Sequence, residues 1–231
     1  TDGYGISMKI VDNFLFPVEK DKGLLITVDN GIVAKDAIKK AKSLGWKVII
    51  IDHHQPEVVD DKVSLPAADL IIDPHAIKGS SNFEDYCAGG LVYKIAQTAN
   101  LSTETLNLIK SFAMMATVCD VVDLVGENRA IAKRSLELIN DNIENTGLRH
   151  LVDINSLESI NEFHYGVVLG PCINACGRLE DASIAVELFI EENEAKASEL
   201  ALKLFELNAE RKAITLDSTD RIINEVENSN L

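Results

Sequence analysis

The sequence predicts an α/β protein in which a parallel sheet flanked by helices is followed by a helical segment with a long connector helix. Three observations support this fold class. Short apolar runs alternate with an amphipathic stretch in the first third of the chain, the middle shows helical periodicity, and residues 194–227 contain no Pro or Gly. Strand, helix and strand at close spacing form a βαβ unit, and such units build parallel sheets that helices cover.

Three strands are predicted, at residues 24–28, 47–51 and 68–72, because each is a short apolar run closed by an aspartate. Between the first two, residues 34–44 place apolar side chains at helical spacing and end at Gly45, which is a common helix stop. The first strand and the helix are separated by Asp-Asn-Gly, a sequence typical of a tight turn.

The rest of the chain is predicted to be mostly helical. Helical periodicity marks residues 89–99, 104–118, 128–139 and 181–190. Residues 147–177 contain Pro171 and several glycines, so turns and a short strand are expected there. Residues 194–227 form one helix of about 45–50 Å, which is too long for the edge of a small domain. We expect it to connect to a region beyond residue 231, and a coiled-coil partner is the alternative.

Composition narrows the class of protein. The chain has 37 acidic and 22 basic residues and a net charge of −15. This charge disfavours a protein that coats polyanions, because such proteins are usually basic. It does not exclude a local nucleic-acid site in which bound cations reverse the sign of the charge. No run approaches the ~20 apolar residues of a membrane span. The cysteines match no zinc spacing and predict reduced, mostly buried thiols of a cytoplasmic protein; they are Cys87, Cys119, Cys172 and Cys176. The missing initiator Met suggests a piece of a longer chain.

A metal site is predicted where the first two strands end. Asp29 closes the first strand, and Asp52, His53 and His54 close the second. Neighbouring parallel strands lie ~4.8 Å apart, so these side chains meet at one edge of the sheet. Carboxylates and imidazoles crowded together favour a divalent cation, and this mixed donor set suits Mn²⁺. The alternatives are that Asp29 only forms a turn and that the histidines are structural or merely exposed.

Two further candidates come from later segments. Asp120 ends a nearly uncharged helix, where a carboxylate opposes the helix dipole and calls for a compensating cation; Asp123 is the weaker candidate ligand. Asn174 and Arg178 lie in a segment framed by Gly and Pro, and an arginine is suited to bidentate phosphate contact. A solvent-facing Asp120 and an ordinary surface Arg178 are the alternatives.

These segments together resemble the DHH phosphoesterase superfamily, and within it the bacterial single-stranded-DNA-specific exonucleases. The resemblance covers nearly the whole chain in five segments that occur in the family's order. They read ITVDNGI at 26–32 with IDHH at 51–54, CAGGLVYKIAQ at 87–97, CDVVDLVGENR at 119–129, INACGRL at 173–179, and LN-x-ER at 207–211.

The resemblance implies a role for each candidate residue. Asp29 corresponds to a carboxylate that bridges two metals, with His53 and Asp120 as further ligands. His54 corresponds to a catalytic group that contacts the scissile phosphate or the attacking water, and Asp52 to the residue that orients the pair. Arg178 corresponds to a phosphate-binding residue, and Asn174 supports its segment.

The implied activity is metal-dependent phosphodiester hydrolysis, 5′ to 3′, on single-stranded DNA, with two Mn²⁺ (or Mg²⁺) ions as cofactors. The implied location is the cytoplasm, without a membrane, with repair proteins as candidate partners and the oligomeric state open. Alternatives are a phosphodiesterase for short oligonucleotides or cyclic dinucleotides, and a non-catalytic scaffold in replication or repair.

One departure from the family concerns the start of the chain. The family carries an upstream Asp-x-Asp-x-x-Gly motif that supplies carboxylates to both metals, and no such motif precedes Asp29. We therefore expect residues 1–155 to be a catalytic domain that lacks its N-terminal part, and residues 156–231 to be an interdomain region with the connector helix. By itself this piece is expected to be inactive.

Overall fold

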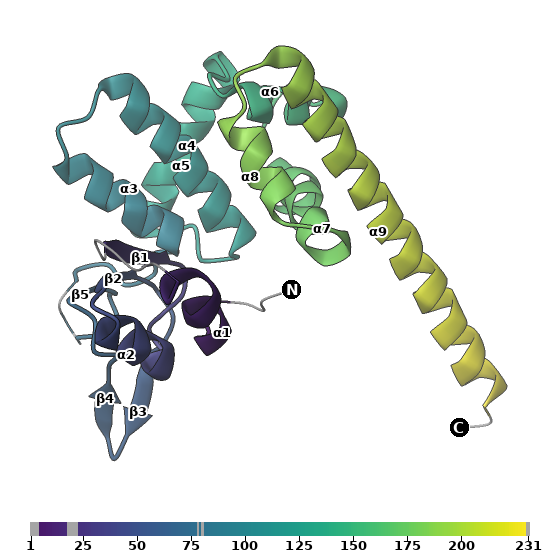
Figure 1. The fold of residues 1–231 in the computed structure, drawn as a ribbon. Coiled ribbons are helices and arrows are strands. Elements are labelled where there is room, and N and C mark those ends of the chain that lie inside the picture. Colours follow the sequence, from purple (N-terminus) through teal and green to yellow (C-terminus); the bar gives the residue numbers. More distant parts are fainter. Residues whose placement is uncertain (1–4, 18–22, 78, 80, 230–231) are drawn as a thin grey trace. The chain divides into compact units, whose positions relative to one another are not determined.

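The computed structural model describes residues 5–17, 23–77, 79 and 81–229. The chain divides into two compact units, Thr1–Ser135 and Leu136–Leu231, and the division falls within helix α5 (Gly126–Asp141). The first unit contains a parallel sheet with its helices, and the second is helical (Figure 1). The predicted α/β fold class with a parallel sheet is confirmed.

The sheet has three parallel strands in the order β1-β2-β5, namely β1 (Leu24–Val28), β2 (Lys47–Ile51) and β5 (Leu70–Ile72). The first two strands occupy the predicted residues, and the third begins two residues later than predicted. Val28 pairs with Ile51, and Ile51 pairs with Ile72, so the three carboxyl ends are level. The residues that follow the strands therefore meet at one edge.

One face of the sheet is covered by α2 (Lys35–Ser43) and the π-helix η1 (Val11–Leu15), which follows the short α1 (Met8–Ile10). These elements share an apolar core with the inward side chains of β2. The buried members are Val11, Leu15, Ala37, Ile38, Ala41, Val48 and Ile50. This core fixes the strands that position the residues at the carboxyl edge.

Between β2 and β5 the chain forms a hairpin that was not predicted, β3 (Glu57–Val59) and β4 (Lys62–Ser64). Its turn residues, Asp60 and Asp61, both have positive φ, as a two-residue hairpin turn of the primed type requires.

The helices α3 (Ala88–Thr98) and α4 (Thr103–Cys119) pack closely against each other, and α3 also contacts β2. A Cβ added at Gly89 would lie 2.5 Å from the Cβ of Ala116, so glycine permits this close approach. Close packing of the two helices therefore explains the glycine at position 89.

The second unit corrects the prediction for residues 147–177. In place of turns and a short strand, the structure has α6 (Thr146–Ile154), the π-helix η2 (His164–Leu169) and α7 (Gly170–Leu179). Pro171 lies in the first turn of α7, where a proline is tolerated because its missing N–H has no helical partner. Helix α8 (Ser183–Ile190) follows, within the range predicted for it.

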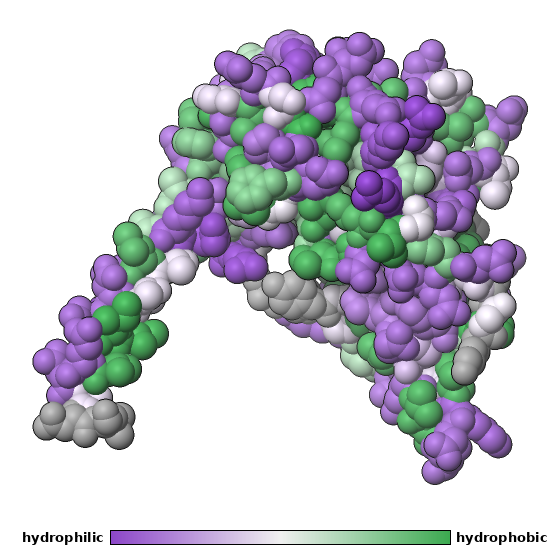
Figure 2. Space-filling model, turned by 180° about the vertical axis from the view of Figure 1, so that it is seen from behind, coloured by the Kyte–Doolittle hydropathy of each residue, from purple (hydrophilic) through white to green (hydrophobic). Residues whose placement is uncertain are grey.

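Helix α9 (Glu194–Asn228) confirms the predicted long helix. Asn193 caps its start by accepting a hydrogen bond from Lys196 N–H. Its first half packs against α6, α7 and α8, whereas every described residue after Arg211 is exposed. Figure 2 shows apolar side chains on this distal part, among them Ile222, Ile223 and Val226.

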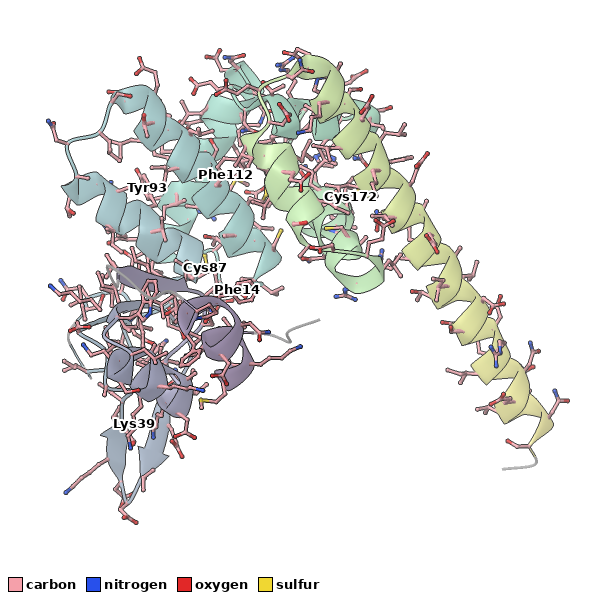
Figure 3. All side chains as sticks on the ribbon, in the orientation of Figure 1. Phe14, Lys39, Cys87, Tyr93, Phe112 and Cys172 are labelled. Carbon is pink, nitrogen blue, oxygen red and sulfur yellow. The ribbon has the colours of Figure 1, made fainter. Side chains whose placement is uncertain are left out.

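The four cysteines form no disulfide, and three of them are buried, as predicted for reduced thiols. Cys87 caps the start of α3, and Cys172 lies inside the second unit (Figure 3). Burial raises the pKa of Cys119 to about 11. No helix in the described part of the chain is long and apolar enough to cross a membrane.

Candidate metal centre

Asp29 is held in place by a sharp turn at the end of β1. Its N–H donates to Ile51 O at 2.9 Å, which extends the pairing with β2 by one residue. Its φ is 64°, a conformation that aspartate tolerates better than most residues. Gly31 follows with φ 116°, and a Cβ there would lie 2.6 Å from Thr27 Oγ1. The turn thus forms as predicted and leaves the Asp29 carboxylate exposed beyond the sheet.

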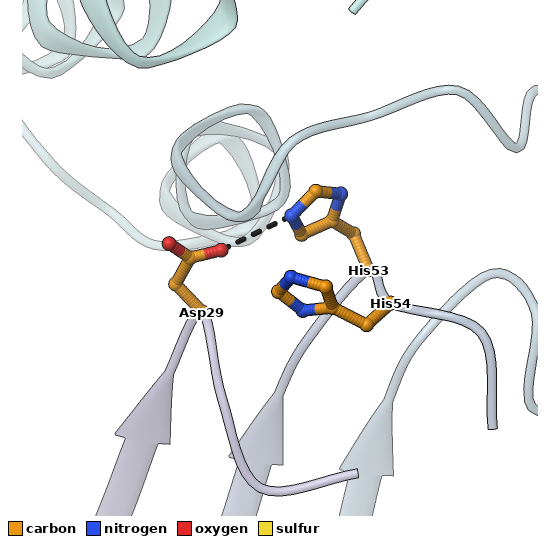
Figure 4. Close-up of side chains that lie close together, drawn as sticks. All are labelled: Asp29, His53 and His54. Atoms are coloured by element: carbon orange, nitrogen blue, oxygen red, sulfur yellow. Dashed lines mark hydrogen bonds and ion pairs between the residues drawn. The ribbon is translucent and has the colours of Figure 1, made fainter. Parts of the chain in front are cut away.

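His53 lies between two carboxylates. Its Nε2 is 3.1 Å from Asp29 Oδ1 and 3.3 Å from Asp120 Oδ2. Figure 4 shows the contact with Asp29. The hydrogen bond to Asp29 raises the pKa of His53, burial opposes this, and the charge of Asp120 adds to it. A single ring nitrogen carries at most one hydrogen, so it cannot donate fully to both carboxylates. The arrangement favours a cation that both carboxylates and the ring nitrogen would share.

Asp52 lies beneath this site, with a side chain that is 1% exposed. Its Oδ2 accepts from Ile32 N–H at 2.9 Å, and its Oδ1 accepts from the N–H groups of His53 and His54 at 2.8 and 3.3 Å. Burial opposes its ionisation, but these bonds and the His54 ring lower the pKa of Asp52 below its ordinary value. These contacts join Asp52 to Ile32, in the loop after β1, and to the two histidines. Asp52 therefore holds these residues in position from inside the protein.

His54 is oriented by the same carboxylate. Its Nδ1 lies 2.6 Å from Asp52 Oδ1, and this contact assigns the hydrogen to Nδ1 because Asp52 is ionised. The Nε2 of His54 is then left as the nitrogen that can accept a proton or bind a ligand. The rings of His53 and His54 have centroids 4.5 Å apart. Asp29, His53 and His54 each offer a ligand atom, and these atoms lie within 4.8 Å of one another.

Asp120 approaches from α4, of which it is the C-terminal cap. Burial raises its pKa; the charge of His53 opposes this and the charge of Asp29 adds to it. A carboxylate at a helix C-terminus also faces the negative end of the helix dipole. Asp123 is exposed three residues later. The structure therefore brings Asp120, and not the weaker candidate, to His53.

The donor set fits a divalent cation. Two carboxylates about 5 Å apart repel by about 3 kcal/mol at an effective dielectric of ~20, and a cation between them reverses that cost. Oxygen and imidazole ligands together suit Mn²⁺ and related ions better than Ca²⁺, which prefers oxygen alone. The residues that would hold the ion are Asp29, His53 and Asp120, with His54 adjacent.

Sequence reasoning passed over one residue at this edge, Asp73. It follows β5 as Asp29 follows β1, so the same positional rule could have found it. Its side chain is largely buried, with the residue 8% exposed, and Oδ1 accepts from His75 N–H at 2.7 Å. Oδ2 is buried and has no hydrogen-bond partner among the described residues. Burial raises the pKa of Asp73; the hydrogen bond from His75 opposes this, and the charge of Asp52 adds to it.

Asn174 and Arg178 lie in the second unit. They are in helix α7 and not in a loop, four residues apart and therefore on one helix face. Both side chains are exposed. This face offers the guanidinium of Arg178 and the amide of Asn174 to a ligand.

Residues 6–119 match the family model described as DHH family, N-terminal domain. This segment contains the sheet, Asp29 and the Asp-His-His triplet. Residues 6–119 thus form a DHH family domain.

Similarity to particular proteins extends further along the chain. The single-stranded-DNA-specific exonuclease RecJ of Bacillus subtilis (strain 168) is 36% identical over 217 residues, which are 92% of this chain and 26% of the relative. RecJ of Haemophilus influenzae (strain ATCC 51907 / DSM 11121 / KW20 / Rd) is 31% identical over 229 residues, 92% of this chain and 38% of the relative. The chain thus spans between a quarter and two fifths of the length of these relatives.

A crystal structure of exonuclease RecJ bound to manganese superimposes with a TM-score of 0.80. The two chains are 26% identical, and the match covers 96% of this chain and 55% of that one. The fold similarity therefore includes both units and is not limited to the sheet.

Proposed function

We propose that the protein carrying this chain is a metal-dependent exonuclease that hydrolyses single-stranded DNA from its 5′ end. The observation that carries the proposal is the convergence of Asp29 and Asp120 on Nε2 of His53, at 3.1 and 3.3 Å, at the edge of the sheet. Its support also comes from relatives that are described as single-stranded-DNA-specific exonucleases and from a solved structure that contains manganese.

In this proposal Asp29, His53 and Asp120 hold Mn²⁺ or Mg²⁺, with two ions in the intact enzyme. The bound cations supply charge that stabilises the transition state and lowers the pKa of coordinated water. His54 offers its Nε2 as the acceptor for the proton of the attacking water or, once protonated there, as a donor to the scissile phosphate, and Asp52 holds that ring in one orientation. Phosphate contact is assigned to Arg178 with Asn174 beside it on α7.

The organisation and location of the protein belong to the same proposal. We assign residues 1–155 to the catalytic domain and residues 156–231 to an interdomain region that includes α9. A cytoplasmic location agrees with four cysteines that form no disulfide. Single-stranded DNA is the proposed substrate, and repair proteins are the proposed protein partners.

The test uses the full-length natural protein, a 5′-phosphorylated single strand and Mn²⁺. We expect release of 5′-mononucleotides, and we expect Asp29→Ala and His53→Ala to lower kcat by about 100-fold or more. The control is His150→Ala, because His150 pairs with Glu194 in the second unit and not with the metal-site residues. A His53→Ala enzyme as active as the wild type contradicts the proposal.

A second arm of the test concerns the substrate class. Turnover of the long strand is compared with that of a dinucleotide and a cyclic dinucleotide. We expect the long strand to be preferred. Faster turnover of the dinucleotides would instead indicate a phosphodiesterase for short substrates.

A further inference from the structure

Val121 has a backbone conformation that its side chain disfavours. It directly follows Asp120, the cap of α4, and its φ is 59°. The residue after a helix cap often adopts this left-handed conformation, and it is usually glycine. The other non-glycine residues with positive φ in the described part are short and polar: Asp29, Asp60, Asp61 and Ser156. Val121 is the β-branched member of the set, for which this conformation is a true outlier.

The side chain of Val121 is also 86% exposed, more than that of any other large apolar residue in the described ranges. Packing therefore does not compensate for the strained backbone. In the free protein this residue is unfavourable both for its backbone conformation and for its contact with water.

The position of Val121 relates it to the candidate metal centre within the first unit. Its neighbour Asp120 places Oδ2 at 3.3 Å from His53 Nε2. The N–H of Val121 donates to Val118 O at 3.2 Å, which closes the last turn of α4 and fixes the direction in which Asp120 leaves the helix. The exposed valine thus directly follows the carboxylate that approaches His53.

Formation of the turn does not explain the valine. Glycine would form the same turn, orient Asp120 equally well and remove both the strain and the exposed apolar surface. We therefore look for a favourable contact of the Val121 side chain outside the free protein. Because Asp120 precedes it, the contact we consider is one with a bound ligand.

We infer that Val121 is a substrate-contacting residue. Its side chain packs against the sugar and base of the nucleotide whose phosphate occupies the site formed by Asp29, His53 and Asp120. This inference rests on the proposed function, because it takes single-stranded DNA as the ligand. An aliphatic contact reads no base edge, so it adds affinity without sequence preference.

The experiment separates the contact from the backbone strain by using three substitutions in the full-length natural protein. Val121→Gly removes both, Val121→Ala removes most of the contact but keeps a side chain at positive φ, and Val121→Leu keeps the apolar surface. We measure the midpoint of thermal unfolding, KM and kcat on a 5′-phosphorylated single strand with Mn²⁺, and equilibrium binding of that strand in chelator, where hydrolysis does not interfere.

We expect Val121→Gly to raise the unfolding midpoint by about 2 °C and yet to raise KM and the dissociation constant about 5-fold, with kcat within about 2-fold of wild type. Val121→Ala should show the same loss of affinity with less gain in stability, and Val121→Leu should bind as the wild type does. The control is Ser156→Gly, which relieves the same conformation after α6 and should leave KM unchanged.

Two results overturn the inference while the proposed function stands. One is an active wild type whose KM and dissociation constant are unchanged by Val121→Gly and Val121→Ala. The other is a fall in the unfolding midpoint for Val121→Gly, which would show that the valine packs against another part of the protein. A wild-type protein that neither binds nor degrades single strands overturns the proposed function and this inference together.

Discussion

At the scale of single residues, Asp52 supports the candidate metal centre through its contacts with the two histidines and with Ile32 N–H. One carboxylate accepts hydrogen bonds from three backbone N–H groups and from the His54 ring. The donors belong to the loop after β1 and to the segment after β2, so the buried charge joins two strand ends. The orientation of both histidines therefore depends on a side chain that a ligand does not reach.

We predict that Asp52→Asn lowers the free energy of unfolding by about 2–3 kcal/mol, because an amide nitrogen would face an N–H donor in place of a charged acceptor. Folding lowers the pKa of Asp52 below its ordinary value of 3.8. The stability that ionised Asp52 gives the wild type is therefore present above pH 3.8 and is lost as the pH falls through the folded-state pKa. Urea unfolding at several pH values measures this, with Asp60→Asn at the hairpin tip as the matched control. Equal effects of both substitutions would contradict the assignment.

Asp73 should show the opposite dependence on pH. Burial raises the pKa of Asp73, so folding favours its protonated form. The stability that this preference gives the folded protein is fully present below pH 3.8, and it is lost as the pH rises through the folded-state pKa. Asp73→Asn keeps an oxygen that can accept from His75 N–H and removes the charge. We expect this variant to be more stable than the wild type at neutral pH and to lose that advantage in acid.

The matched control for Asp73 is Asp69→Asn in the same unit. Asp69 pairs with Lys42 and accepts from Val48 N–H, and these contacts lower its pKa. Asp69→Asn should therefore be less stable than the wild type at neutral pH, and the difference should shrink in acid. Urea unfolding across this pH range gives both curves. Two curves of the same sign would refute the interpretation of Asp73.

At the scale of elements, the pattern of apolar residues predicted the helices and strands whose ends are marked in the sequence itself. The strands at 24–28 and 47–51 and helix α9 were predicted almost residue by residue, because apolar spacing and stop residues determined them locally. Helices α6 and α7 were missed, since Pro171 and nearby glycines read as turns, whereas tertiary packing and a first-turn proline make the segment helical. The hairpin at 57–64 was missed because three-residue strands carry too little pattern.

The candidate metal centre was predicted only in part, because sequence position determines the place of some of its residues and tertiary packing that of the others. Asp29 and the Asp52–His54 segment lie at strand ends, so sequence position alone brought them together. Asp120 was a candidate because it ends a helix, but its approach to His53 depends on how α4 packs and could not be predicted from the sequence. Asp73 was missed although it also ends a strand, and its burial shows only in three dimensions.

The contact between α3 and α4 makes a testable pair. Gly89→Ala would place a methyl group 2.5 Å from the Cβ of Ala116, so we expect a loss of about 1–3 kcal/mol in unfolding free energy, despite the better helix propensity of alanine. Ala116→Gly in the same chain should restore most of that loss, and denaturant unfolding of the four proteins of this cycle measures the coupling. A coupling near zero would show that the two helices approach less closely.

At the scale of the whole molecule, the excess of negative charge links cation binding to stability. The chain carries a net charge of −15, and two of its carboxylates converge on one imidazole. Any cation that binds the folded chain in preference to the unfolded one stabilises it in proportion to the logarithm of its concentration. Metal binding and folding are therefore linked, and stability reports occupancy without requiring turnover.

We predict that Mn²⁺ at 100 times its dissociation constant raises the free energy of unfolding of the full-length natural protein by about 2.7 kcal/mol over that in chelator. Asp120→Asn and Asp29→Asn should each abolish most of this gain, because each removes a charged ligand beside His53. Asp123→Asn is the matched control, since it removes the same charge three residues away at an exposed position. A gain that survives Asp120→Asn but is lost in Asp123→Asn would place the ion on the α4–α5 loop and not at the sheet edge.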